Sequence, residues 1–189
     1  MVGQTFLSAF VFLSFSRTPR RSYNTAMRYL TTALLILSTS LWLGGLVALA
    51  ALVMAVFISS GLDRETAGKA TSSMFVWFGK GQLVVAAVAL IATFLAYLQR
   101  RGAAVVAVFV LLALGTLGAV AFNVWLVPKL ESLRLSGQSQ SADFKNLHQQ
   151  SEHLMTAVIA IVFVAAMTLP AVIRRLYADR PASTSASAD

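Results

Sequence analysis

A long stretch without charge near the start of the chain is the feature that most restricts its fold. No charged residue stands between Arg28 and Asp63, and residues 30–58 form 29 mostly apolar positions. A helix needs about 20 such residues to cross the hydrocarbon core of a bilayer. The stretch therefore predicts a membrane-spanning helix over residues 30–58.

Three further apolar segments predict spans over residues 73–98, 102–128 and 152–174. Lipid offers the backbone no hydrogen-bond partners, and the segments are too long and too uniformly apolar for barrel strands, so each span must be helical. We expect Pro128 and Lys129 to end the third helix. The predicted fold class is an all-α membrane protein, a four-transmembrane-helix bundle.

The composition agrees with this fold class, since 58% of the residues are hydrophobic and only 12% are charged. Soluble domains carry about a quarter charged residues, so the composition excludes a soluble enzyme. The net charge is +8. In a membrane protein such an excess reflects cytoplasmic loops, so we expect the lipid bilayer as partner and no nucleic acid.

Positive residues gather on one side of the predicted spans. Cytoplasmic loops carry the excess of Lys and Arg, so both termini are predicted to be cytoplasmic, with residues 59–72 and 129–152 outside. This topology fits a bacterial inner membrane protein. The nine arginines on the predicted cytoplasmic side are Arg17, Arg20, Arg21, Arg28, Arg100, Arg101, Arg174, Arg175 and Arg180.

The predicted membrane domain covers residues 30–176, with residues 1–29 and 177–189 on either side. The apolar residues 5–15 are too few to span a membrane and lack the basic start of a secretory signal. We interpret residues 1–29 as an N-terminal extension, and we hypothesise that translation starts at Met27, directly before the first span. The end of the chain is rich in Ser and Ala, so residues 177–189 are predicted to form a disordered tail.

A polar cluster is expected at the outer boundary of the membrane, where the third span ends and the fourth begins. At helical spacing Phe144, His148, Ser151 and Met155 share one face, so we expect His148 to point toward the bundle. Two interpretations are open: the cluster closes a pocket, or its side chains form an interhelical clasp worth about 0.6 to 2 kcal/mol. The residues of this cluster and its surroundings are Asn123, Trp125, Pro128, Phe144, His148 and Ser151.

His148 and His153 are the candidate metal ligands, since imidazole commonly binds copper, zinc and haem iron. Five residues apart on a helix, they diverge by roughly 140°, so one ion cannot easily take both. The chain has no cysteine. The favoured prediction is therefore no metal and no cofactor, and the alternative is a copper or haem handling protein that uses these histidines with methionines of other helices.

Two large side chains lie inside predicted spans. Lys80 is expected to extend its long side chain to the outer interface, and a role toward a proton, an anion or a ligand is the alternative. Trp42 lies near the middle of the first span, away from the interfaces where tryptophan usually anchors helices. We expect it to pack against neighbouring helices.

Small residues recur on two spans and predict close helix packing. Gly44 and Gly45 stand in the first span, and Gly115 and Gly118 in the third. Such residues let helices approach closely, and they serve a bundle as readily as a dimer. A homo-oligomer or a membrane partner protein is therefore a further expectation.

No catalytic motif stands out. The sequence has no phosphate-binding loop, no nucleophile elbow and no acidic residue within the predicted spans apart from Glu152 at the start of the fourth. The chain is therefore predicted not to be an enzyme. An enzyme acting on a lipid or a porphyrin would have only His148, His153 and Lys80 as acid or base.

Four motifs together resemble the transmembrane-protein-205-like family, small four-helix membrane proteins of bacteria and eukaryotes with a core domain of unknown function. The motifs are Leu41-Trp42-Leu43-Gly44-Gly45, Met74-Phe75, Asn123-x-Trp125-x-x-Pro128 and Phe144-x-x-Leu147-His148-x-x-Ser151-x-x-Leu154.

The resemblance extends over residues 30–176 and implies a four-helix membrane protein of unknown, non-enzymatic activity. Its eukaryotic relatives suggest a role in stress or drug tolerance. The family is also distantly similar to the copper-resistance D-like membrane proteins and their haem-associated relatives, in which a histidine precedes the tryptophan of the first helix. Residues 38–41 contain no histidine here.

Overall fold

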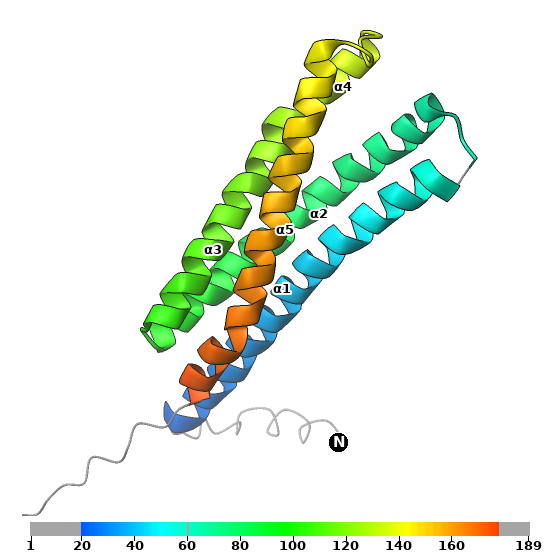
Figure 1. Ribbon diagram of the computed structural model, residues 1–189. Coiled ribbons are helices and arrows are strands. Elements are labelled where there is room, and N and C mark those ends of the chain that lie inside the picture. The colour runs from blue at the N-terminus through cyan, green and yellow to red at the C-terminus, as the bar shows by residue number, and fades with distance from the viewer. Residues whose placement is uncertain (1–19, 60, 178–189) are drawn as a thin grey trace, which may run out of the picture.

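The computed structural model describes residues 20–59 and 61–177, which are helical apart from short connections (Figure 1). Within these residues there is no strand. The expected N-terminal extension before residue 20 and the expected tail after Tyr177 lie outside the described residues. The elements are α1 (Arg20–Ser59), α2 (Arg64–Gln99), α3 (Ala103–Val120), the π-helix η1 (Ala121–Leu126), α4 (Val127–Leu135) and α5 (Ala142–Tyr177).

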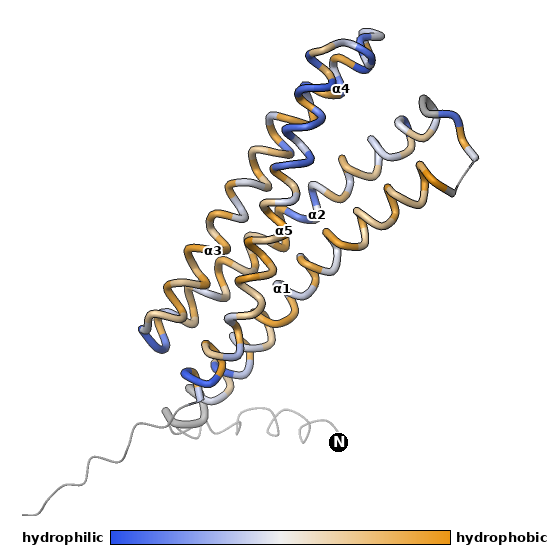
Figure 2. Tube along the Cα trace, in the orientation of Figure 1, coloured by the Kyte–Doolittle hydropathy of each residue, from blue (hydrophilic) through white to orange (hydrophobic). Residues whose placement is uncertain are grey.

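Four helical segments of the described chain are long and apolar enough to cross a membrane. Each coincides with one of the four predicted spans to within a residue at its shared end or encloses it, so the prediction of an all-helical fold with four helices able to span a membrane is confirmed for the described residues. Apolar residues fill most of the length of these helices in Figure 2, and hydrophilic residues concentrate at their ends. The segments are Thr25–Ile58, Thr66–Gln99, Ala103–Leu135 and Ala142–Tyr177.

The helices pack in a ring in which each contacts two neighbours. α1 lies against α2, α2 against α3, α3 against α5, and α5 closes the ring against α1. In Figure 1 the α1–α2 pair and the α3–α5 pair separate toward the end of the molecule that carries α4. The tightest part of the bundle is therefore the half that lies away from α4.

The interior of the bundle consists of small and branched apolar side chains at helical spacing. α2 contributes almost only alanine, which brings its backbone close to α1 and α3. Trp42, at 1% exposure, is the largest buried side chain. The buried apolar residues of the central cluster include Leu35, Trp42, Leu46, Ala86, Ala89, Ala92, Ala96, Val105, Val108, Leu112, Val158, Val162, Ala165, Val172 and Leu176.

Glycines mark the closest helix contacts. A methyl group on Gly118 would lie 2.6 Å from Cγ2 of Val158, so α3 and α5 meet where no larger residue fits. A methyl group on Gly45 would lie 3.0 Å from the Phe78 ring, which makes the corresponding contact between α1 and α2. Gly44 has nothing within 4 Å of that position. Three of the four glycines predicted to bring helices together thus do so inside the bundle, because Gly115 also packs against Val162.

The third helix does not end at Pro128, and the prediction that it does is wrong. The helical path continues from α3 through η1 and α4 to Leu135. In η1 the backbone N–H of Val127 donates to the carbonyl of Phe122, five residues back, instead of four. A proline ring normally clashes with the carbonyl four residues before it, and a local π turn is one of the adjustments that keep such a helix intact.

The glycine contacts yield a prediction on stability. Gly118→Ala is expected to lower the melting temperature in detergent, because the added methyl overpacks the α3–α5 contact at a cost of about 1 to 3 kcal/mol. Gly44→Ala is the matched control, since its methyl meets nothing and alanine favours a helix by about 0.5 to 1 kcal/mol. Thermal unfolding of both variants, followed by circular dichroism, checks this. Equal melting temperatures would contradict the assigned contact.

Candidate functional site

Asn123 lies on the wide turn η1 and faces α2. Its amide Nδ2 donates to the carbonyl of Ala119, 2.8 Å away on its own helix. Its Oδ1 lies directly against Gly79 of α2, so close that a methyl group there would overlap it. The α2–η1 contact therefore depends on a glycine opposite the asparagine.

Ser151 is buried, and His148 is not. The Ser151 hydroxyl donates to the carbonyl of His148, 2.6 Å away. The His148 side chain is 58% exposed, with Nε2 3.3 Å from Oε1 of Glu152, and its ring stacks on that of Phe144 with centroids 5.9 Å apart. The expectation that His148 points toward the bundle is therefore wrong. The face that packs inward runs through Leu147 and Ser151, and His148 lies about 100° around the helix from Leu147.

The predicted outer cluster is thus not joined by hydrogen bonds. Within the described part of the chain, the side chains of Asn123, His148 and Ser151 bond to their own helices and not to one another. His153 is exposed on α5 as well. Among the described residues no three His, Cys, Asp or Glu side chains lie close enough to hold a metal ion together.

Two lysines lie over nearby tryptophans, one within α2 and the other where η1 continues into α4. Lys80 Nζ lies 4.8 Å from the centroid of the Trp77 ring, and Lys129 Nζ lies 4.5 Å from that of Trp125. Trp77 is 73% exposed and Trp125 is also exposed. A cation over an exposed tryptophan ring is attracted to it by about 0.5 to 1 kcal/mol. Lys80 therefore reaches the surface of the bundle along its own helix.

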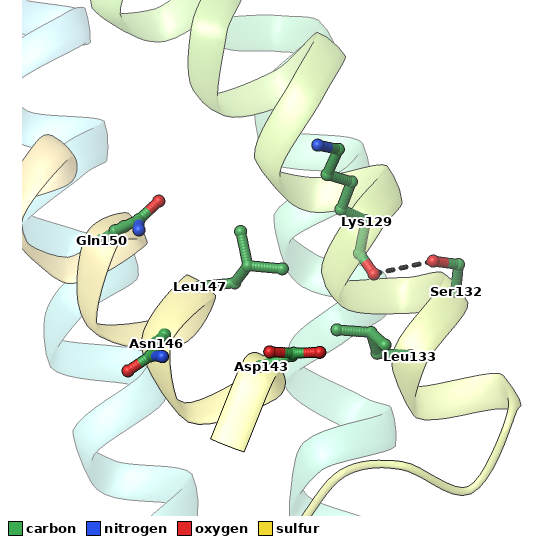
Figure 3. Close-up of a pocket in the computed structure, with 7 residues that line it drawn as sticks. All are labelled: Lys129, Ser132, Leu133, Asp143, Asn146, Leu147 and Gln150. Carbon is green, nitrogen blue, oxygen red and sulfur yellow. Dashed lines mark hydrogen bonds between the residues drawn. The ribbon is translucent and has the colours of Figure 1, made fainter. Parts of the chain in front are cut away.

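A shallow groove of about 420 Å³ lies between α4 and the start of α5 (Figure 3). Leu147 points toward α4 in this view, and Asp143 lies near Leu133. Ser132 donates its hydroxyl to the carbonyl of Lys129, 2.8 Å away, which uses that hydroxyl within α4. The residues that line the groove are Lys129, Ser132, Leu133, Asp143, Asn146, Leu147 and Gln150.

α4 is tied to α2 by a carboxylate. The Ser72 hydroxyl donates to Oε2 of Glu131 at 2.8 Å, and Arg134 donates to both carboxylate oxygens of Glu131 at 2.9 and 2.6 Å. Such a two-pronged pair fixes the carboxylate more firmly than a single hydrogen bond would. The segment beyond Pro128 is thereby held against the N-terminal part of α2, at Ser72.

The centre of the bundle holds polar side chains that the sequence analysis missed. Gln82 of α2 is 4% exposed and Thr39 of α1 is fully buried, in the same region as Trp42. Neither amide atom of Gln82, nor Thr39 Oγ1, nor Trp42 Nε1 has a hydrogen-bond partner within the described residues. Gln82 is the one amide residue in the apolar run of residues 81–98, and this was the available indication.

A bundle of four helices that are each long and apolar enough to cross a membrane is typical of a small multi-pass membrane protein. Residues 37–139 match the family described as Domain of unknown function (DUF4149), and since the match covers more than half of the 189 residues, the chain belongs to that family. No curated protein and no solved structure matches the chain. The matched range contains Trp42, Gln82 and Asn123, whereas both histidines lie beyond it.

The Glu131 contacts yield a second prediction. Glu131→Gln is expected to lower the melting temperature, because the bonds to Ser72 and Arg134 lose their charge, with a cost of about 1 kcal/mol. Glu152→Gln is the matched control, since this carboxylate is 65% exposed and pairs with His148 on its own helix. Thermal unfolding in detergent compares the two. A larger loss for the Glu152 variant would show that α4 is not held through Glu131.

Proposed function

We propose that the protein is a non-enzymatic, multi-pass inner membrane protein of bacteria, related to the transmembrane-protein-205-like family. It acts by binding and association within the bilayer, as a homo-oligomer or with a membrane partner protein. One observation carries this proposal: the buried polar side chains of the described residues are all uncharged. They are Thr31, Ser38, Thr39, Thr71, Gln82, Thr93 and Ser151.

An uncharged interior argues for binding rather than catalysis. General acid and base catalysis needs a titratable side chain within reach of the reacting group, and proton-coupled carriers use acidic residues or histidines inside the membrane. In the described residues, His148, His153 and Lys80 are all exposed. They therefore lie outside the bundle interior in which such chemistry would be shielded from water.

The kinship with the transmembrane-protein-205-like proteins is supported by where the shared motifs lie. Trp42 and Gly45, from the first motif, lie in helix contacts, with the Trp42 ring against Gly115 of α3. Asn123, from the third motif, occupies the wide turn against α2. Trp42, Gly45 and Asn123 thus contribute to contacts between the helices, which a shared fold would require.

The proposed topology is supported by the end of the bundle at which the arginines gather. The rings of Tyr29 and Tyr177 have centroids 5.6 Å apart, so the start of α1 and the end of α5 meet. Arg175 lies against Gly102 in the α2–α3 connection, which brings the Arg100–Arg101 pair to the same end. By the positive-inside rule this end is cytoplasmic.

Reporter fusions check the orientation in a bacterial host. Green fluorescent protein fused after Asp189 is expected to fluoresce, because the C-terminus is cytoplasmic. Alkaline phosphatase inserted in residues 136–141, the connection between α4 and α5, is expected to be active, because that side is periplasmic. The reverse pattern, or fractionation with the outer membrane, would refute the proposed location.

Metal and haem analysis of the purified protein tests the proposed role. We expect a protein without a Soret band or near-stoichiometric copper. His148→Ala and His153→Ala are expected to melt like the wild type, because both side chains are exposed, and the partners of His148 lie on its own helix. A Soret band or bound copper that is lost with either histidine would replace this proposal by copper or haem handling.

A further inference from the structure

Three buried polar side chains near the middle of α1 and α2 have no hydrogen-bond partners within the described residues. Trp42 and Thr39 stand three residues apart on α1, and Gln82 stands on α2. All three are more than nine-tenths buried. Within the described residues, the Trp42 Nε1–H, the Thr39 hydroxyl and both atoms of the Gln82 amide make no hydrogen bond.

The packing of α1 and α2 places Trp42 and Gln82 at one level. The two antiparallel helices touch where Gly45 meets the Phe78 ring. Trp42 lies three residues before Gly45, and Gln82 lies four residues after Phe78, so both are about one turn from this contact in the same direction. Gln82 also shares a face of α2 with Phe78, which is the face turned toward α1.

The tryptophan ring closes the other side of this region. A methyl group on Gly115 of α3 would lie 3.4 Å from Cη2 of Trp42, so the ring extends from α1 to α3. α1 and α3 are not neighbours in the ring of helices, and the Trp42 side chain therefore crosses the centre of the bundle. The unpartnered groups of Trp42, Thr39 and Gln82 therefore lie inside the bundle and not at its surface.

Several other buried hydroxyls of the same helices do find partners. Thr93 donates to the carbonyl of Ala89 at 2.7 Å, Thr71 to Ala67 at 2.9 Å, and Ser38 to Leu34 at 2.5 Å. Such bonds to the preceding turn are the usual way in which membrane helices bury hydroxyls. Six buried side-chain atoms of the described residues have no partner; four of them belong to Thr39, Trp42 and Gln82, and the other two are Thr32 Oγ1 and Gln99 Oε1. A buried polar group without a partner requires an explanation.

We propose that Trp42, Gln82 and Thr39 form a binding site for an uncharged hydroxyl group at the centre of the bundle. The oxygen of the bound hydroxyl accepts a hydrogen bond from the Trp42 Nε1–H, and its O–H donates to the side-chain oxygen Oε1 of Gln82. The Gln82 side-chain N–H and the Thr39 hydroxyl are the other unpartnered polar groups of the proposed site. A charged ligand does not fit, because no charged side chain is buried among the described residues to balance it.

The hydroxyl comes from one of two sources, a buried water molecule or an apolar alcohol that enters from the lipid. Both offer the same donor and acceptor to the site. The proposal does not depend on the topology or on the kinship proposed above, since it rests on the interior of the bundle alone.

Nuclear magnetic resonance of the protein labelled with 15N-tryptophan tests the site. Trp42→Phe identifies the indole signal of Trp42, and the exposed Trp77 and Trp125 serve as internal references. For bound water, we expect a cross-peak between the Trp42 indole proton and long-lived water. For an alcohol, we expect a saturable shift of the Trp42 signal on titration with deuterated 1-octanol.

The variants separate binding from packing. Gln82→Leu is expected to abolish the water cross-peak or to weaken the 1-octanol response about tenfold, through loss of a buried hydrogen bond. Thr39→Val, of nearly equal size, is expected to weaken the same signal and serves if the Gln82 variant does not fold. Thr93→Val is the matched control, because its hydroxyl is already bonded within α2, and it is expected to keep the wild-type response.

Two results would overturn the proposal. The first is a wild-type protein with neither a water cross-peak at Trp42 nor a saturable response to 1-octanol. The second is a Gln82→Leu protein that keeps the wild-type signal or melts at a higher temperature, since replacing a truly orphaned amide by an apolar side chain stabilises a core.

Discussion

Close approach between helix backbones is the condition on which the rest of this bundle depends. Inside a bilayer, helices gain little from leaving the lipid, so they associate through tight packing and a few hydrogen bonds. Here that packing rests on the alanine face of α2 and on glycines opposite larger side chains, with Gly118 against Val158 and Gly45 against Phe78. Trp42 then fills the centre that these contacts leave, and its ring ends against Gly115.

The π turn η1 connects this packed region to the end of the molecule that carries α4. It allows Pro128 to lie inside a continuous helix and places Asn123 against Gly79 of α2. The helix can then extend into α4, where Glu131 accepts a hydrogen bond from Ser72 of α2. A helix that ended at the proline would not have brought Glu131 to Ser72. Wide turns of this kind occur frequently at functional sites, and this one adjoins the most polar part of the interior.

The four spans were predictable because long apolar runs have only one stable form in lipid, and the uncharged stretch between Arg28 and Asp63 is sufficient evidence for the first of them. The continuation past Pro128 was not predictable, because it depends on a change of hydrogen-bond spacing that no residue type dictates. The orientation of His148 was predicted wrongly, because residue spacing gives the faces of a helix but not which face packs against other helices. In the structure the packed face contains Leu147 and Ser151. Gln82 was overlooked since a single uncharged amide hardly changes the hydropathy of its span.

The distribution of polar groups separates two kinds of region in this protein. Charged residues concentrate toward the helix ends, where arginines meet at one end and the Trp125–Lys129 pair lies toward the other. Among the described residues the buried polar side chains are all neutral donors and acceptors, and those of Trp42, Thr39 and Gln82 lack partners there. A bundle selected for stability alone would replace Gln82 by an apolar residue, since an orphaned amide in lipid is costly. The presence of Gln82 opposite α1, at the level of Trp42, is therefore better explained by something that this part of the bundle binds.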